Sequence, residues 1–146
     1  MARVDRGVST AVGYVLNLGI ATLLVTGLLV AGSGLVADQR ERAAGAELDV
    51  IGNRIAADLE TADRLVRNGN GSVTVRTSLP NTVAGSSYRV AIESTGGNAT
   101  VIVSTNDPSL ARTVPVVNET PIRPTTVSGG SIVVRGNQTG LEVTDG

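Results

Sequence analysis

A long stretch without charge is the first pattern along the chain. Residues 7–37 carry no charged side chain and are mostly apolar, whereas a helix spans a bilayer with roughly 20 apolar residues. We therefore predict a transmembrane helix over residues 8–36. At about 1.5 Å per residue this stretch exceeds the hydrocarbon thickness of about 30 Å, so we expect it to emerge from the membrane or to break near Gly32, Ser33 and Gly34.

After the membrane segment the apolar positions follow a helical period. They lie three or four residues apart and form one stripe, at Leu48, Ile51, Ile55, Leu59, Ala62 and Val66. Acid-before-base pairs stand four apart on the other faces: Asp38 with Arg42, Glu60 with Arg64 and Asp63 with Arg67. We expect mild bends at Gly45 and Gly52, and an end at the Asn/Gly cluster 68–71. Residues 37–71 are therefore an amphipathic helical extension with its turn, and the whole helix is expected from about Val8 to Asn68.

From residue 72 the apolar period changes to two, which is typical of β-strands. The predicted strands are 73–79, 88–92, 101–103, 114–117, 132–134 and 141–143. Pro115 places the fourth of them at a sheet edge, and Pro121 and Pro124 predict a loop before residue 132. The fold class is α+β: one long amino-terminal helix, transmembrane and then amphipathic, followed by a small antiparallel β-sheet head over residues 72–146.

Composition removes most chemistry from this picture. The chain has no Cys and no His, so it has no disulfide, thiol nucleophile, Ser-His-Asp triad or imidazole metal ligand. The head carboxylates are scattered singly, at Glu93, Asp107, Glu119, Glu142 and Asp145. We expect no enzyme activity, no catalytic residue, no cofactor, no metal site and no small-molecule substrate. The 12 basic residues are balanced by 13 acids, which gives no field for nucleic acid.

The charges that flank the uncharged stretch predict its orientation. Arg3 and Arg6 precede it, whereas a mixed cluster, 38–42, follows it. The positive-inside rule then places the amino terminus inside and the head outside the cytoplasmic membrane.

Small and polar residues inside the apolar helix are candidates for helix packing. Ser9 with Gly13, and Gly27 with Ala31, stand four apart, a spacing that lets helix backbones approach, while Thr22 and Thr26 could donate hydrogen bonds across such a contact. Asn17 prefers a hydrogen-bond partner in hydrocarbon, either on a second helix or on its own helix backbone.

Four Asn-x-Ser/Thr sequons follow the membrane segment and are candidate glycosylation sites. They begin at Asn70, Asn98, Asn118 and Asn137. Three of them lie in predicted turns on the side placed outside. The alternative is turn-forming asparagine with Ser or Thr nearby by chance.

The amino terminus carries the most specific motif. Arg6 and Gly7 stand before the apolar helix, whereas an ordinary secretory signal has its cleavage site after the apolar core. This arrangement resembles the class III signal peptide of type IV pilins and archaellins, and RGVSTAVGYVL looks like the start of haloarchaeal pilin-like membrane proteins. Many pilins carry Glu at the fifth residue after the cut, where this chain has Val12.

The resemblance implies a function and partners. A prepilin-type peptidase would remove the leader, residues 1–7, by cutting between Gly7 and Val8. The mature chain would be a major, minor or pseudopilin-like subunit of a type IV pilus-like archaeal surface assembly, packing its helix against itself or other pilin-like subunits. Archaeal filaments of this family are often N-glycosylated.

Two other interpretations remain. The chain could be a single-pass surface protein, with an extracellular head, that never polymerises. It could also be a soluble β domain released by cleavage near residues 31–33, although the apolar stripe directly after that point argues against release.

Overall fold

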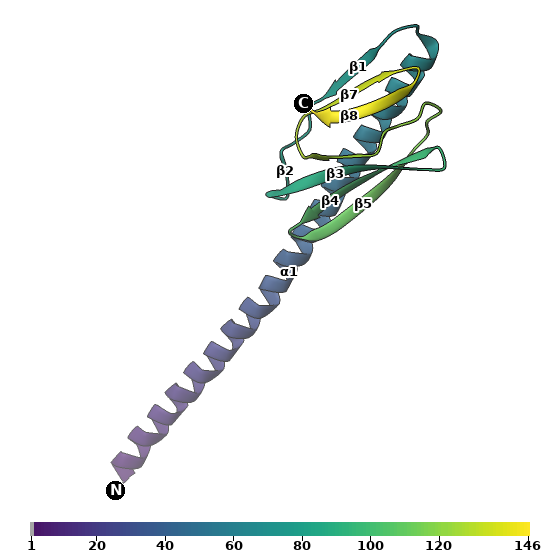
Figure 1. Cartoon of the computed structure of the whole chain (residues 1–146). Helices are drawn as coiled ribbons and strands as arrows, with labels where there is room; N and C mark the ends of the chain where they lie inside the picture. Colours follow the sequence, from purple (N-terminus) through teal and green to yellow (C-terminus); the bar gives the residue numbers. More distant parts are fainter. Residues whose placement is uncertain (1) are drawn as a thin grey trace. The chain divides into compact units, whose positions relative to one another are not determined.

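The computed structural model describes residues 2–146, with side chains from Arg6 onward, so Arg3 and most of the predicted leader lie outside the described side chains. The chain divides into two compact units, Met1–Gln39 and Arg40–Gly146. One long helix, α1 (Ala2–Asn68), is followed by β-strands that pair antiparallel (Figure 1). The α+β class with a pilin-like layout is therefore confirmed.

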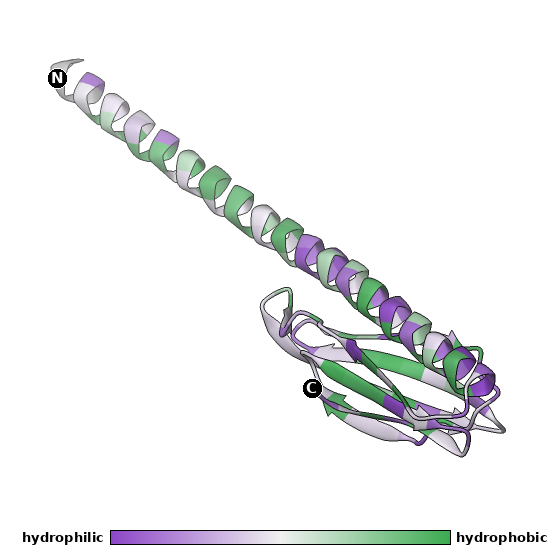
Figure 2. Ribbon diagram, turned by 90° about the horizontal axis from the view of Figure 1, so that it is seen from above, coloured by the Kyte–Doolittle hydropathy of each residue, from purple (hydrophilic) through white to green (hydrophobic). Residues whose placement is uncertain are grey.

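The first part of α1 is helical without interruption. The helix begins at Ala2 rather than at Val8. Gly32, Ser33 and Gly34 are helical, so of the two alternatives for this place, emergence from the membrane or a break, the break is not found. A single glycine lowers the stability of a helix by only about 1 kcal/mol and keeps its backbone hydrogen bonds, so the helix continues through these residues. Of the described residues, Arg6–Asn68 form one helix long and apolar enough to cross a membrane, and its first part is mostly hydrophobic (Figure 2).

The head consists of two antiparallel sheets instead of one. The first has the order β1 (Val73–Thr77), β7 (Ile132–Asn137) and β8 (Gly140–Asp145). The second has the order β2 (Thr82–Val83), β3 (Ser86–Thr95), β4 (Asn98–Asn106) and β5 (Ser109–Val116), with β6 (Thr125–Ser128) also paired to β3. Strand β5, which contains Pro115, is an edge strand as predicted.

Three strands depart most from the prediction: β5 is longer than predicted, and β2 and β6 were not predicted. Strand β5 starts at Ser109, five residues before the predicted run, and the two-residue β2 was not predicted. Strand β6 lies where Pro121 and Pro124 predicted only a loop. Its register pairs Val127 with Val90 of β3, and Val127 is its only buried residue. A strand with one buried side chain shows no period in sequence.

The core forms where both sheets pack on the second part of α1. The predicted stripe is buried from Leu48 to Val66, and the alternate valines and isoleucines of β3, β4, β7 and β8 face it. The two glycines for which bends were expected have another role. A Cβ atom at Gly52 would lie 2.9 Å from Val114 Cγ2, and one at Gly45 would lie 2.6 Å from the Arg112 guanidinium. Both glycines are therefore places where β5 packs closely on the helix.

Candidate functional site

The exposed apolar surface of α1 is the main candidate site. In the most apolar stretch of this helix, 18 residues long, no residue is buried. Its large hydrophobic side chains are about half or more exposed, from 48% for Ile20 to 74% for Leu23. Large uncovered apolar surfaces mark contact with a membrane or with another protein.

The predicted packing residues gather on one side of this helix. With 3.6 residues per turn, Ser9 and Gly27 are separated by five whole turns, and Gly13 and Ala31 follow each of them by four residues. A Cβ atom at Gly13 or Gly27 would meet nothing within 4 Å. These glycines therefore leave a stretch of backbone open that the packing described within the chain does not use.

The polar residues of this segment behave differently from one another. Thr22 and Thr26 donate their hydroxyl hydrogens to the carbonyls four residues earlier, at 2.8 Å each, so these donors are used within the helix. Asn17 is exposed, and its amide makes no hydrogen bond to any described residue. Of the two alternatives for Asn17, bonding to its own helix backbone is thus not found.

Gly7 and Val8, the predicted processing pair, lie in the first turns of α1. Val8 is 57% exposed, and a Cβ atom at Gly7 would meet nothing within 4 Å. A larger residue at position 7 would therefore not disturb the packing of the described residues, so its effect on processing can be measured by itself.

The second part of α1 holds the head through carboxylates. Glu47 Oε2 accepts a hydrogen bond from the Ala84 N–H at 3.0 Å, and Glu60 Oε1 accepts one from the Val117 N–H at 3.2 Å. Asp58 accepts a hydrogen bond from the Thr77 hydroxyl. The spacing in the sequence predicted ion pairs between Glu60 and Arg64 and between Asp38 and Arg42. Neither pair forms in the described residues.

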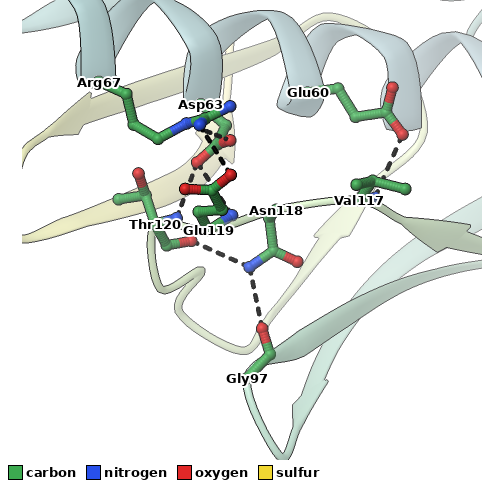
Figure 3. Close-up of polar contacts among 8 residues, drawn as sticks. All are labelled: Glu60, Asp63, Arg67, Gly97, Val117, Asn118, Glu119 and Thr120. Carbon is green, nitrogen blue, oxygen red and sulfur yellow. Dashed lines mark hydrogen bonds and ion pairs between the residues drawn. The ribbon is translucent and has the colours of Figure 1, made fainter.

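Asp63 is the central contact of this set (Figure 3). Its side chain is 2% exposed, and Oδ1 accepts hydrogen bonds from the N–H groups of Thr120 at 2.8 Å and Glu119 at 3.3 Å. The predicted partner Arg67 does pair with Asp63, at 3.1 Å, and also with Glu119, at 2.8 Å. The Asp63 carboxylate, predicted as one half of a solvent-exposed pair, thus fixes the loop between β5 and β6.

The surroundings of Asp63 lower its pKa below the usual 3.8. Burial by itself raises the pKa, but the hydrogen bonds from Thr120 and Glu119 and the charge of Arg67 together outweigh burial. The native state therefore favours the ionised form of Asp63 more than the unfolded chain does.

We expect acid to weaken the head through this group. Because the pKa of Asp63 is lower in the folded state, ionised Asp63 stabilises the fold fully above about pH 3.8. This stabilisation is lost as the pH falls through the pKa of the folded state. Unfolding of the full chain in detergent, followed from about pH 6 to about pH 2, should show a steeper acid loss in wild type than in Asp63→Asn. An unchanged slope in that variant would contradict the assignment, and Asp49→Asn is the matched control.

The four sequons lie in different surroundings. The Asn118 side chain is bonded to the fold on both sides: its Nδ2 donates hydrogen bonds to the carbonyls of Gly97 at 3.1 Å and Thr120 at 3.0 Å (Figure 3). Its Oδ1 accepts a hydrogen bond from the Ala99 N–H. A glycan would replace one of the two Nδ2 hydrogens that these bonds use. Asn118 is therefore the least favourable of the four for attachment.

The other three sequon asparagines are exposed at turns. Asn70 follows the end of α1, Asn98 starts β4 after the Gly96-Gly97 turn, and Asn137 ends β7. The Asn137 Oδ1 accepts hydrogen bonds from the backbone N–H and the hydroxyl of Thr139. Neither of these bonds uses its Nδ2, the atom to which a glycan would be attached. The geometry leaves these three positions open as candidates.

The scattered head carboxylates do not converge. Glu119 pairs with Arg67, and Asp145 accepts a hydrogen bond from the Ser128 N–H. In the described residues, no three acidic side chains gather where they could hold a metal ion.

A groove beside α1 escaped sequence reasoning. It has a volume of about 520 Å³ and lies between Ala46, Val50 and Ile51 of the helix and the segment 79–82 before β3. Glu47 and Arg54 stand at its rim. Its signal in the sequence is Val50, an apolar residue outside the buried stripe, and this side chain is 68% exposed.

Comparison with known proteins gives one assignment. No functionally curated protein and no solved structure matches the sequence. The family DUF7266, which is described as a family of unknown function, matches residues 3–144. Because this match covers nearly the whole chain, the protein belongs to the DUF7266 family.

Proposed function

We propose that this protein is a structural subunit, major, minor or pseudopilin-like, of a type IV pilus-like archaeal surface assembly. The observation that carries the proposal is the uncharged stretch of α1, residues 8–36, whose large apolar side chains are exposed and which directly follows the Arg6-Gly7 motif. A pilin-like layout of one long helix followed by antiparallel sheets supports it.

The proposed mechanism uses one surface twice. The apolar helix first lies in the cytoplasmic membrane with its amino terminus inside. After cleavage it packs on the helices of itself or other pilin-like subunits. Close approach of helices in an apolar medium needs small residues, which Ser9, Gly13, Gly27 and Ala31 supply on one side of α1. Asn17 can then donate across the contact.

The partners follow from this mechanism. They are the membrane, a prepilin-type peptidase and pilin-like subunits, and the protein acts without catalysis, nucleic acid or a small-molecule substrate. The head lies outside the cell, where glycans would be attached to Asn70, Asn98 or Asn137.

The second candidate is a single-pass surface protein that does not polymerise. One observation favours it: Val12 occupies the position where the resembled pilins carry a glutamate that pairs with a neighbouring amino terminus. Under this alternative the same helix serves only as an anchor, and the chain keeps its first seven residues.

Cleavage between Gly7 and Val8 separates the two candidates. We expect intact-mass and amino-terminal peptide mass spectrometry of the protein from its native membranes to give a chain that begins at Val8. We also expect Gly7→Val to abolish processing, because it replaces the small residue directly before the cut. The change leaves the described packing intact, so a loss of processing would reflect recognition by the peptidase. Gly13→Val is the matched control, since position 13 has equal space but lies beyond the cut. A full-length chain in wild type would contradict the pilin-like proposal and favour the anchor.

A further inference from the structure

The groove beside Val50 has an apolar floor and no net charge at its rim. Ile51 of α1 and Leu79 after β1 are buried and form the floor, while Val50 stands 68% exposed in the wall. The rim carries one acid, Glu47, and one base, Arg54. Glu47 is held in place by its hydrogen bond from the Ala84 N–H. Such a site favours an uncharged apolar occupant over a charged one.

Val50 is unusual among the exposed residues of the second unit. Within the described part of Arg40–Gly146, only Val50, Leu65 and Val117 are large hydrophobic side chains counted as exposed. Of these three, Val50 alone lines this groove. Together with Ala46 and Ile51, Val50 gives the groove an apolar lining on the side of the helix.

We propose that this groove receives the apolar helix, residues 8–36, of a second copy of the chain. The inference rests on the proposed function and adds the docking surface on the head. The occupant is argued from the chain itself: residues 7–37 are uncharged, their large apolar side chains are exposed, and the groove offers an apolar lining without net charge.

Both surfaces carry small residues where a contact between two helices would form. On the groove side, the wall formed by α1 presents Ala46, whose small side chain lets a second backbone come close. On the incoming helix, Gly13 and Gly27 have no neighbour within 4 Å of a Cβ position. Small residues on both sides are what close packing of two helices requires.

Photo-crosslinking in assembled filaments tests the docking. A photoreactive phenylalanine at position 50 should give covalent dimers whose linked peptide lies within residues 8–36 of the second copy. The same amino acid at Thr113, an exposed position of β5, is the control and should give no link to that segment. Links from position 50 to a lipid, to another protein or to a head, or no link at all, would overturn the inference.

A pair of matched substitutions tests the same contact without a probe. Val50→Asp should lower the yield of sheared filaments by about tenfold or more, while Val117→Asp, at an 80% exposed position outside the groove, should stay within about twofold of wild type. Hydrogen exchange of the β-strand amides checks that both heads are folded. Equal yields of the two variants would overturn the groove and leave the proposed function standing, whereas a wild type that forms no filament would overturn both.

Discussion

Replacing Asp63 by alanine should lower the free energy of unfolding of the head by about 3 kcal/mol. The Asp63 side chain is 2% exposed and accepts the N–H groups of Thr120 and Glu119. Alanine leaves the buried Thr120 N–H without an acceptor and removes the carboxylate that pairs with Arg67. A buried donor without a partner retains its full desolvation cost, which is why the loss exceeds that of one surface ion pair.

Asp49→Ala is the matched control on the same helix. Asp49 is 53% exposed and makes one ion pair, with Arg112 at 3.3 Å, so its removal should cost less than about 1 kcal/mol. Hydrogen exchange of the β3 and β4 amides, measured on the full chain in detergent micelles, reports the stability of the head directly. Losses of equal size in the two variants would show that Asp63 is not the central contact.

The helix was predictable because its signal is local. The stripe from Leu48 to Val66 repeats at the helical period and is buried throughout, and the uncharged stretch before it requires only a count of charges. The helix end predicted at the Asn/Gly cluster is confirmed as well, since α1 ends at Asn68. Each of these features depends on residues a few positions apart, which a single sequence contains.

The roles of the helix acids were not predictable because their partners are remote in sequence. Glu60 and Asp63 each have an arginine four residues later, and that spacing alone indicates a surface pair. In the fold they accept hydrogen bonds from residues 117–120 instead. Whether such an acid lies in solvent or accepts hydrogen bonds from the head backbone depends on where the loop between β5 and β6 packs. A single sequence does not contain that information.

Of the candidate functional surfaces, one was predictable from the sequence and the other was not. The apolar surface of residues 8–36 follows from composition. The groove beside Val50 has one wall from α1 and another from residues 79–82, so no local period indicates it. Strand β6 was missed for a related reason, because its place is determined by pairing with β3 and by one buried valine.

Replacing Gly52 by leucine should destabilise the head by about 3 kcal/mol, although leucine is the better helix former. A Cβ atom at position 52 would lie 2.9 Å from Val114 Cγ2 and 3.5 Å from Val103 Cγ2. Val103 is completely buried, so the added side chain has no space to enter. Strand β5 would have to move away from the helix, which outweighs the gain of about 1 kcal/mol in helix propensity.

Gly45→Leu separates this steric effect from helix propensity. A Cβ atom at position 45 would meet the Arg112 guanidinium at 2.6 Å, but that group ends a long side chain which is 40% exposed. The guanidinium can turn into solvent, at the loss of a surface ion pair worth under about 1 kcal/mol, and leucine returns a similar amount in helix propensity. The stability of Gly45→Leu should therefore stay within about 1 kcal/mol of wild type, measured by the same amide exchange. If Gly52→Leu were equally stable, these glycines would act on the helix alone, and close packing of β5 at Gly52 would not hold the head in place.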